Sequence, residues 1–229
     1  MAESDPSTTS FKRRGPESHE RLLEAGIDIF GEFGFKAATT RMIAEKAGVN
    51  IAAIPYYFSG KEGLYHAVVG HIVEKLRVEA EEALQKIVQH AADKGLSACQ
   101  ALDLLEDFLG RIVDFMVGSP EAPRFVRIIL REQLYPSAAY DVIFNRLMNP
   151  IVGAITRLIA IAAGIPENRD TGLRAMAFMG QIMAFRVARE TVVRRLGLKG
   201  YTPEETTQIR RVILEHTRAA VGALANGGL

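Results

Sequence analysis

The sequence lacks the features that secretion or a membrane span would require. It contains one cysteine, Cys99, so no disulfide can form within the chain. No charged segment followed by an apolar one opens it, as in a secretory signal. The longest apolar stretch, residues 151–165, is interrupted by Arg157 and is too short to cross about 30 Å of hydrocarbon. We therefore expect a buried helix there, no membrane partner and a cytoplasmic protein.

Catalytic and cofactor motifs are also missing. The histidines are scattered without the spacing of a metal site: His19, His66, His71, His90 and His216. We find no phosphate-binding loop and no nucleophile elbow. The sequence therefore predicts a protein that is not an enzyme, with no cofactor and no metal.

An excess of positive charge is absent as well. Lys and Arg number 28 against 27 Asp and Glu, which gives a formal net charge of +1. No overall basic field attracts nucleic acid, so DNA binding has to be argued from local segments. Hydrophobic residues make up 48% of the chain, enough to fill the core of one large or two small domains.

The first residues differ in composition from the rest. Residues 1–10 are rich in Ser, Thr and Pro, and Lys12, Arg13 and Arg14 add a basic run. We interpret residues 1–16 as a flexible basic arm. Such an arm can enter a minor groove, although a basic tail is more often simply solvated.

Helical periodicity begins directly after the arm. Apolar residues at three-and-four spacing predict a helix over residues 17–33, ended by Gly34. Thr39 is a suitable N-cap for a second helix through Ala47, and Gly48 stands where helices commonly end in a left-handed turn.

A third short segment and a long helix follow. Asn50 is a suitable N-cap for a helix over residues 50–58. Ser59 and Glu62 have the spacing of a capping box for a helix over residues 60–94. Three short helices with a tight turn between the second and third are typical of a helix-turn-helix DNA-binding domain.

The remaining chain is also predicted to be helical. Its expected helices cover residues 97–117, 122–134, 138–163, 169–196 and 203–224. Thr202, Pro203 and Glu205 give the last one a capping box with proline at the first position. No segment shows the alternation of apolar and polar residues that is typical of a strand, so we predict an all-α fold. In this fold a long helix joins the N-terminal helix-turn-helix domain, called the head below, to a C-terminal helical bundle.

The sequence motifs of the head identify a family more specifically than its pattern of helices does. Residues 39–44 read TTRMIA, 47–50 read AGVN, and 54–58 read IPYYF, followed by Lys61, Glu62 and Leu64. Over residues 17–65 the chain resembles the TetR family, and REQLYP at 131–136 with Asn149-Pro150 resembles its CecR-like branch. The resemblance implies a homodimer on a palindromic double-stranded DNA operator, with residues 66–229 as a ligand-binding and dimerisation domain.

Candidate DNA-binding residues follow from positions in the head. They are Thr39, Thr40, Arg41, Asn50, Ile51, Ala52, Ala53, Tyr56, Tyr57 and Lys61. Hydroxyls and free N–H groups at a helix start suit phosphate oxygens, and residues of the first turn of a recognition helix lie nearest the bases. Ile51, Ala52 and Ala53 can offer methyl contacts to thymine. Lys61 resembles the family's phosphate-binding lysine.

Pro55 departs from the commonest family pattern. At the fifth position of the predicted helix it removes a hydrogen bond to Ile51, at a penalty of up to about 3 kcal/mol in a helix interior. We therefore expect the recognition helix to be kinked or short.

The C-terminal part offers candidates for an effector pocket. Apolar walls with a few converging polar groups favour Phe108, Ile112, Phe125, Arg131, Gln133 and Phe178. Most bulky apolar residues here must be plain core. The CecR-like branch resembles regulators of efflux and drug-response genes, which implies a small hydrophobic effector.

Small and apolar residues on the last two long helices suit a bundle between two subunits. They are Ala177, Gly180, Ala184, Val187, Ala188, Ile209, Val212, Ile213 and Ala220. The function predicted is a transcriptional repressor released from its operator by the effector. The alternatives are an all-helical ligand-binding or adaptor protein that does not repress, and an activator.

Overall fold

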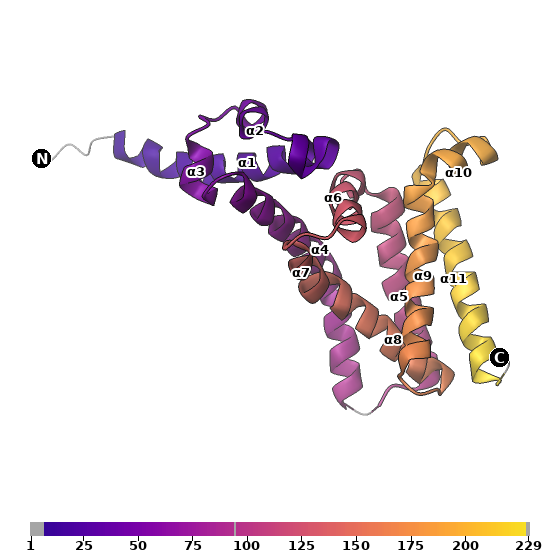
Figure 1. Ribbon diagram of the computed structural model, residues 1–229. Coiled ribbons are helices and arrows are strands. Elements are labelled where there is room, and N and C mark those ends of the chain that lie inside the picture. The colour runs from indigo at the N-terminus through magenta and orange to yellow at the C-terminus, as the bar shows by residue number, and fades with distance from the viewer. Residues whose placement is uncertain (1–6, 94, 228–229) are drawn as a thin grey trace, which may run out of the picture. The chain divides into compact units, whose positions relative to one another are not determined.

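The computed structural model describes residues 7–93 and 95–227, and every element in these ranges is helical (Figure 1). This confirms the all-α prediction. The chain divides into two compact units. One contains residues up to Leu76 together with Arg124–Phe144, and the other contains Arg77–Pro123 and the residues from Asn145 onward.

The first unit is built around a three-helix head. Its elements are α1 (Ser7–Ala37), α2 (Thr40–Ala47), α3 (Ala53–Phe58), the first half of α4 (Lys61–Asp93), most of α6 (Ala122–Leu134) and α7 (Tyr140–Ile143). Helix α1 packs on both α2 and α3. The core of the head is filled by completely buried residues of α1 to α4: Leu22, Ile27, Phe30, Ile43, Ile54 and Leu64.

Helix α1 differs from the prediction at its start. It begins at Ser7 rather than near Glu17, so the boundary expected for the arm falls inside a helix, while residues 1–6 lie outside the described range. Lys and Arg are good helix formers, which favours extension through this segment. At its other end, Gly34 has φ 74° and ψ 170° and breaks the helix, as its position in the sequence predicted.

Helix α6 is tied to the head by charged side chains. Arg124 Nε lies 2.6 Å from Asp28 Oδ1, and its Nη2 lies 2.9 Å from Glu24 Oε2. The hydroxyl of Tyr65 on α4 donates to Glu132 Oε1 at 2.6 Å, and the Ser137 amide donates to Glu132 Oε2 at 3.0 Å. Burial and the hydrogen bond to Glu132 hold the pKa of Tyr65 well above its usual range, so the phenol stays a donor.

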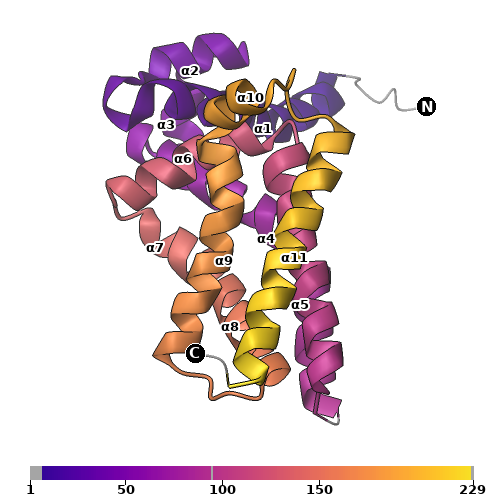
Figure 2. The same cartoon turned by 90° about the vertical axis from the view of Figure 1, so that its right-hand side faces the viewer.

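The second unit is a helical bundle. Its elements include α5 (Ala98–Val113), the π-helical turn η1 (Asp114–Gly118), α8 (Asn149–Ala163), α9 (Arg169–Val187), α10 (Arg189–Leu196) and α11 (Pro203–Ala225). Helix α8 contacts α5, α9 and α11, and α5 also contacts α11 (Figure 2). The segment 140–163 is apolar enough to span a membrane by length and composition, but these contacts make α8 a core helix, as predicted.

Local chemistry explains two helix boundaries in this part of the chain. Thr202 and Glu205 form the predicted capping box, with the Thr202 amide donating to Glu205 Oε2 at 2.9 Å. A π-helical turn, η2 (Phe144–Met148), ends two residues before Pro150. Proline lacks an N–H and crowds the carbonyl four residues earlier, so a locally wider helix accommodates it.

Candidate nucleic-acid interface

Helix α2 has the two caps that the sequence predicted. Thr39 Oγ1 accepts from the Met42 amide at 3.2 Å, and Gly48 ends α2 in the left-handed region with φ 63°. The Gly48 and Val49 amides donate to the carbonyls of Glu45 and Ala44, which closes the turn.

Helix α1 holds this turn in place. Nη2 of Arg21 donates to the Gly48 carbonyl at 3.2 Å. The left-handed backbone at Gly48 favours glycine, and a Cβ there would lie 2.5 Å from the same nitrogen, so the Arg21 side chain would have to move and its bond to the turn would be disturbed. Sequence reasoning missed Arg21, because its partner is a backbone carbonyl 27 residues away and carries no sequence signal.

The start of α2 presents polar side chains to solvent. Thr39 and Arg41 are exposed, and Thr40 is half-buried. Arg41 Nε lies 2.8 Å from Glu45 Oε1 in a pair that is solvent-accessible on both sides. Such surface pairs contribute little to stability, so a phosphate can replace Glu45 as the partner of Arg41. The hydroxyl proton of Thr39 stays available to an acceptor while its oxygen caps the helix.

Helix α3 starts later than the sequence predicted. Asn50 Oδ1 accepts from the Ala52 amide at 2.9 Å and so caps a turn rather than the helix, which begins at Ala53. Ile51 and Ala52 lie in this turn, exposed, and Ala53 is half-buried. The shift makes Pro55 the third residue of a six-residue helix, where amides have no helical partner in any case. The helix is short, as expected, but the interior penalty predicted for Pro55 does not apply.

The end of α3 also differs from the prediction. Ser59 has φ 58° and forms the C-cap of α3, whereas an N-cap of α4 would need an extended backbone. The predicted capping box of Ser59 and Glu62 is therefore wrong. A Cβ at Gly63 would lie 1.7 Å from the Phe58 carbonyl oxygen, so α3 and α4 meet at a position that only glycine fits.

Two tyrosines follow each other along α3. Tyr56 is 81% exposed, while Tyr57 is half-buried with its ring edge-on to His19 of α1, 5.7 Å between centroids. His19 also stacks on Phe58 at 4.7 Å. His19 thus packs against the Tyr57 ring, a contact that the sequence did not reveal.

Lys61 is positioned by the segment that follows the break in α1. Its Nζ donates to the Lys36 carbonyl at 3.3 Å and lies 4.7 Å from the centroid of the Phe35 ring. The ammonium has further donors free for an anion, since it carries three protons.

The predicted effector residues belong to two different units. Phe108 and Ile112 on α5 and Phe178 on α9 lie in the bundle, where both phenylalanines are buried. Phe125, Arg131 and Gln133 on α6 lie in the unit of the head.

The three residues on α6 have neighbours within that unit. The Phe125 centroid lies 5.7 Å from Lys75 Nζ, and Gln133 Oε1 accepts from the Tyr140 hydroxyl at 3.2 Å. The Arg131 guanidinium packs so closely on Gly34 that a Cβ there would be 2.3 Å from Nη1. An effector pocket made by all six residues therefore stays a prediction.

Comparison with known sequences agrees with these features. The family model described as bacterial regulatory proteins, tetR family, matches residues 22–68. The model described as the C-terminal domain of the HTH-type transcriptional dual regulator CecR matches residues 101–224. CecR of Shigella flexneri is 34% identical over 228 residues, which cover 94% of this chain and 96% of that protein. RutR of Escherichia coli (strain K12) is 36% identical over 75 residues, 32% of this chain and 35% of that protein.

Solved structures share the fold at low sequence identity. A putative fatty acid metabolism regulator of Clostridium perfringens has a TM-score of 0.61 and 19% identity, covering 85% of this chain and 97% of its own. AibR, solved in complex with isovaleryl coenzyme A and operator DNA, has a TM-score of 0.62 and 15% identity, covering 86% of this chain and 96% of its own.

Proposed function

The chain belongs to the TetR family of DNA-binding transcriptional regulators, in its CecR-like branch. From that premise we propose that the protein represses transcription from a palindromic operator. We further propose that the protein leaves this operator when a small hydrophobic effector binds. The DNA-binding part of the proposal rests on a row of polar side chains that are exposed or held in place by neighbours. This row consists of Thr39 and Arg41 on α2, Tyr57 on α3 and Lys61 at the start of α4. Relatives of this kind are regulators rather than enzymes.

In the proposed complex, phosphates bind to both ends of this row. Thr39, Arg41 and the α2 amides contact one strand, and Tyr57 and Lys61 contact the backbone beyond α3. Because Asn50 caps a turn, Ile51 and Ala52 protrude ahead of α3 and are free for methyl contacts with thymine. Such contacts discriminate weakly between bases, so we expect phosphate contacts to dominate the affinity.

Dimerisation through α9 is part of the proposal. Its exposed apolar and small residues recur at helical spacing along one face: Leu173, Met176, Ala177, Gly180, Ala184 and Val187. On α11, in contrast, Ile209 and Ile213, which the sequence suggested, are buried within the protomer, so we do not include them in the proposed interface. Two heads must reach successive major grooves, about 34–36 Å apart, so a dimer is needed for tight binding.

The effector is proposed to act by changing the separation of the two heads. Helix α4 contributes residues to both compact units, so a rearrangement of the bundle can reach the head through it. The residues inside the bundle are apolar, and we propose that a hydrophobic ligand binds between its helices. AibR, which shares the fold, is described with isovaleryl coenzyme A as well as DNA, so acyl thioesters are reasonable first probes.

The experiment is to incubate the purified protein with fragmented genomic DNA, recover the bound fragments and sequence them at two salt concentrations. We expect enrichment of an inverted repeat that weakens steeply at the higher salt. The absence of any enriched sequence from a folded dimer would favour the adaptor alternative instead.

Activation is the second candidate, because the relative CecR is described as a dual regulator. A reporter gene behind the recovered operator separates the two. Lower expression in the presence of the protein indicates repression, and higher expression indicates activation.

A further inference from the structure

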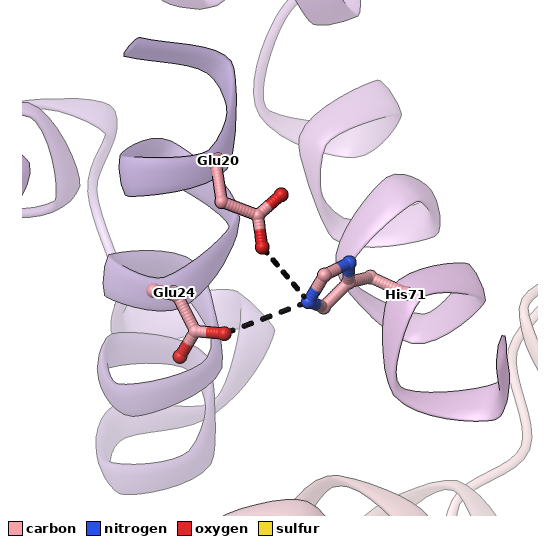
Figure 3. A group of neighbouring side chains, drawn as sticks. All are labelled: Glu20, Glu24 and His71. Atoms are coloured by element: carbon pink, nitrogen blue, oxygen red, sulfur yellow. Dashed lines mark ion pairs between the residues drawn. The ribbon is translucent and has the colours of Figure 1, made fainter. Parts of the chain in front are cut away.

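Three side chains with metal-binding atoms converge between α1 and α4. Glu20 and Glu24 lie one turn apart on α1, and His71 projects toward both from α4 (Figure 3). His71 Nε2 lies 3.5 Å from Glu20 Oε1 and 3.5 Å from Glu24 Oε1. One donor atom from each residue lies within 4.8 Å of the others.

The spacing of these atoms suits a shared ion better than a direct bond. A charged imidazole hydrogen-bonded to a carboxylate would bring nitrogen and oxygen to about 2.7–2.9 Å. Bond lengths of about 2.0–2.1 Å in a tetrahedral zinc site place neighbouring donor atoms about 3.3 Å apart. His71 Nε2 is shielded from solvent and has no hydrogen-bond partner, which is a costly state for a polar atom.

We propose that Glu20, Glu24 and His71 form a binding site for a divalent transition-metal ion such as Zn²⁺. A mixed set of imidazole nitrogen and carboxylate oxygen suits zinc and its neighbours, whereas calcium and magnesium prefer oxygen alone. The Glu20 side chain is 55% exposed, which leaves room for water as a fourth ligand. The ion would join α1 to α4 within one compact unit.

Positively charged side chains next to Glu24 limit the affinity of this site for a metal ion. Lys75 Nζ lies 2.7 Å from the same Glu24 Oε1, and Arg124 Nη2 lies 2.9 Å from the other carboxylate oxygen. Partial burial raises the pKa of Glu24, but the hydrogen bonds from Lys75 and Arg124 outweigh it and lower the pKa overall. The carboxylate is therefore ionised and able to bind a metal, in competition with Lys75.

The test is isothermal titration of chelator-stripped full-length protein with Zn²⁺. A Cys99→Ser background removes the exposed thiol, a separate zinc ligand. We expect one ion per protomer. His71→Ala abolishes binding and Glu20→Gln weakens it, while His66→Ala, an exposed histidine on the same helix, leaves it unchanged. Lys75→Met raises the affinity about tenfold by removing a nearby positive charge.

Two further measurements use the parent protein, so they do not depend on whether a variant folds. Co²⁺ replaces Zn²⁺ and is expected to give visible absorption bands that report tetrahedral ligands. Unfolding is expected at a temperature about 5–10 °C higher when free Zn²⁺ is 100 times its dissociation constant. No binding by the parent protein, or unchanged binding by both His71→Ala and Glu20→Gln, overturns the proposal. It does not depend on the proposed regulatory function.

Discussion

Single side chains at the head are fixed by partners that are distant in sequence. Lys61 is held by the Lys36 carbonyl and the Phe35 ring, and Tyr57 is held by His19. A fixed side chain loses less conformational entropy when it binds a phosphate, so these two residues should contribute more to affinity than mobile surface residues.

We expect Lys61→Met to weaken operator binding without altering the fold. Each lysine that neutralises a phosphate contributes about 0.9 to the slope of log affinity against log salt. The slope for the variant should fall by about that amount per protomer, measured by fluorescence anisotropy across a salt series. Lys199→Met, at an exposed position outside the head, serves as the charge-matched control. An unchanged slope for Lys61→Met would exclude this residue from the phosphate contacts.

Tyr57→Phe tests the hydroxyl separately from the ring. The ring keeps its contact with His19, so the melting temperature should stay within about 1 °C of the parent protein. Loss of one hydrogen bond of about 0.5–1.5 kcal/mol should weaken operator binding roughly 2- to 13-fold for each protomer. Equal affinity in both proteins would show that Tyr57 acts only in packing.

Residue chemistry made part of this site predictable. Thr39 and Gly48 indicate where α2 begins and ends, because helix capping depends on local residue type. The contacts of Arg21 and Lys61 were not predictable, since each donates to a backbone carbonyl more than twenty residues away. The ion pair of Arg41 with Glu45 joins residues four positions apart on one helix, so it could be inferred from the sequence.

At the scale of elements, the sequence predicted that the helices exist, but it did not predict where several of them begin and end. Helix α3 begins at Ala53 because the Asn50 side chain forms a turn with the Ala52 amide. Residue type alone does not distinguish such a turn from a helix cap, since asparagine favours both. Pro55 therefore occupies the first turn of α3, where it is well tolerated.

The junction of α3 and α4 gives a stability prediction. Gly63→Ala would put a Cβ 1.7 Å from the Phe58 carbonyl oxygen, and relief requires backbone movement. We expect a loss of about 3 kcal/mol, at the upper end of overpacking effects. Gly70→Ala, on the same helix with nothing within 4 Å of its Cβ, should instead stabilise by about 0.5–1 kcal/mol. Urea unfolding of both variants measures the difference, and equal stabilities would contradict the close approach.

At the scale of the whole molecule, the grouping of helices was the least predictable feature. The sequence suggested a DNA-binding part at residues 17–65 and a second part at 66–229, and this functional division stays a prediction. In the structure, α6 and α7 join the compact unit of the head. The bonds from Arg124 to Glu24 and Asp28 join residues 100 and 96 positions apart, a separation that no periodicity reveals.

The proposed dimer gives a prediction about assembly. Ala184→Arg puts a charge on the exposed apolar face of α9, and burial of an unpaired charge is strongly unfavourable. We expect a folded monomer by light scattering, with operator affinity reduced at least 100-fold because one head is lost. Glu167→Arg, at an exposed loop position, should remain dimeric. A dimeric Ala184→Arg protein would exclude this face.

The most direct test of a symmetric, site-specific regulator is the affinity for the recovered operator compared with the same fragment in which one half-site is scrambled. We predict that scrambling one half-site weakens binding at least 100-fold at constant salt, because the second head then has only non-specific contacts. Equal affinity for both fragments would contradict the account.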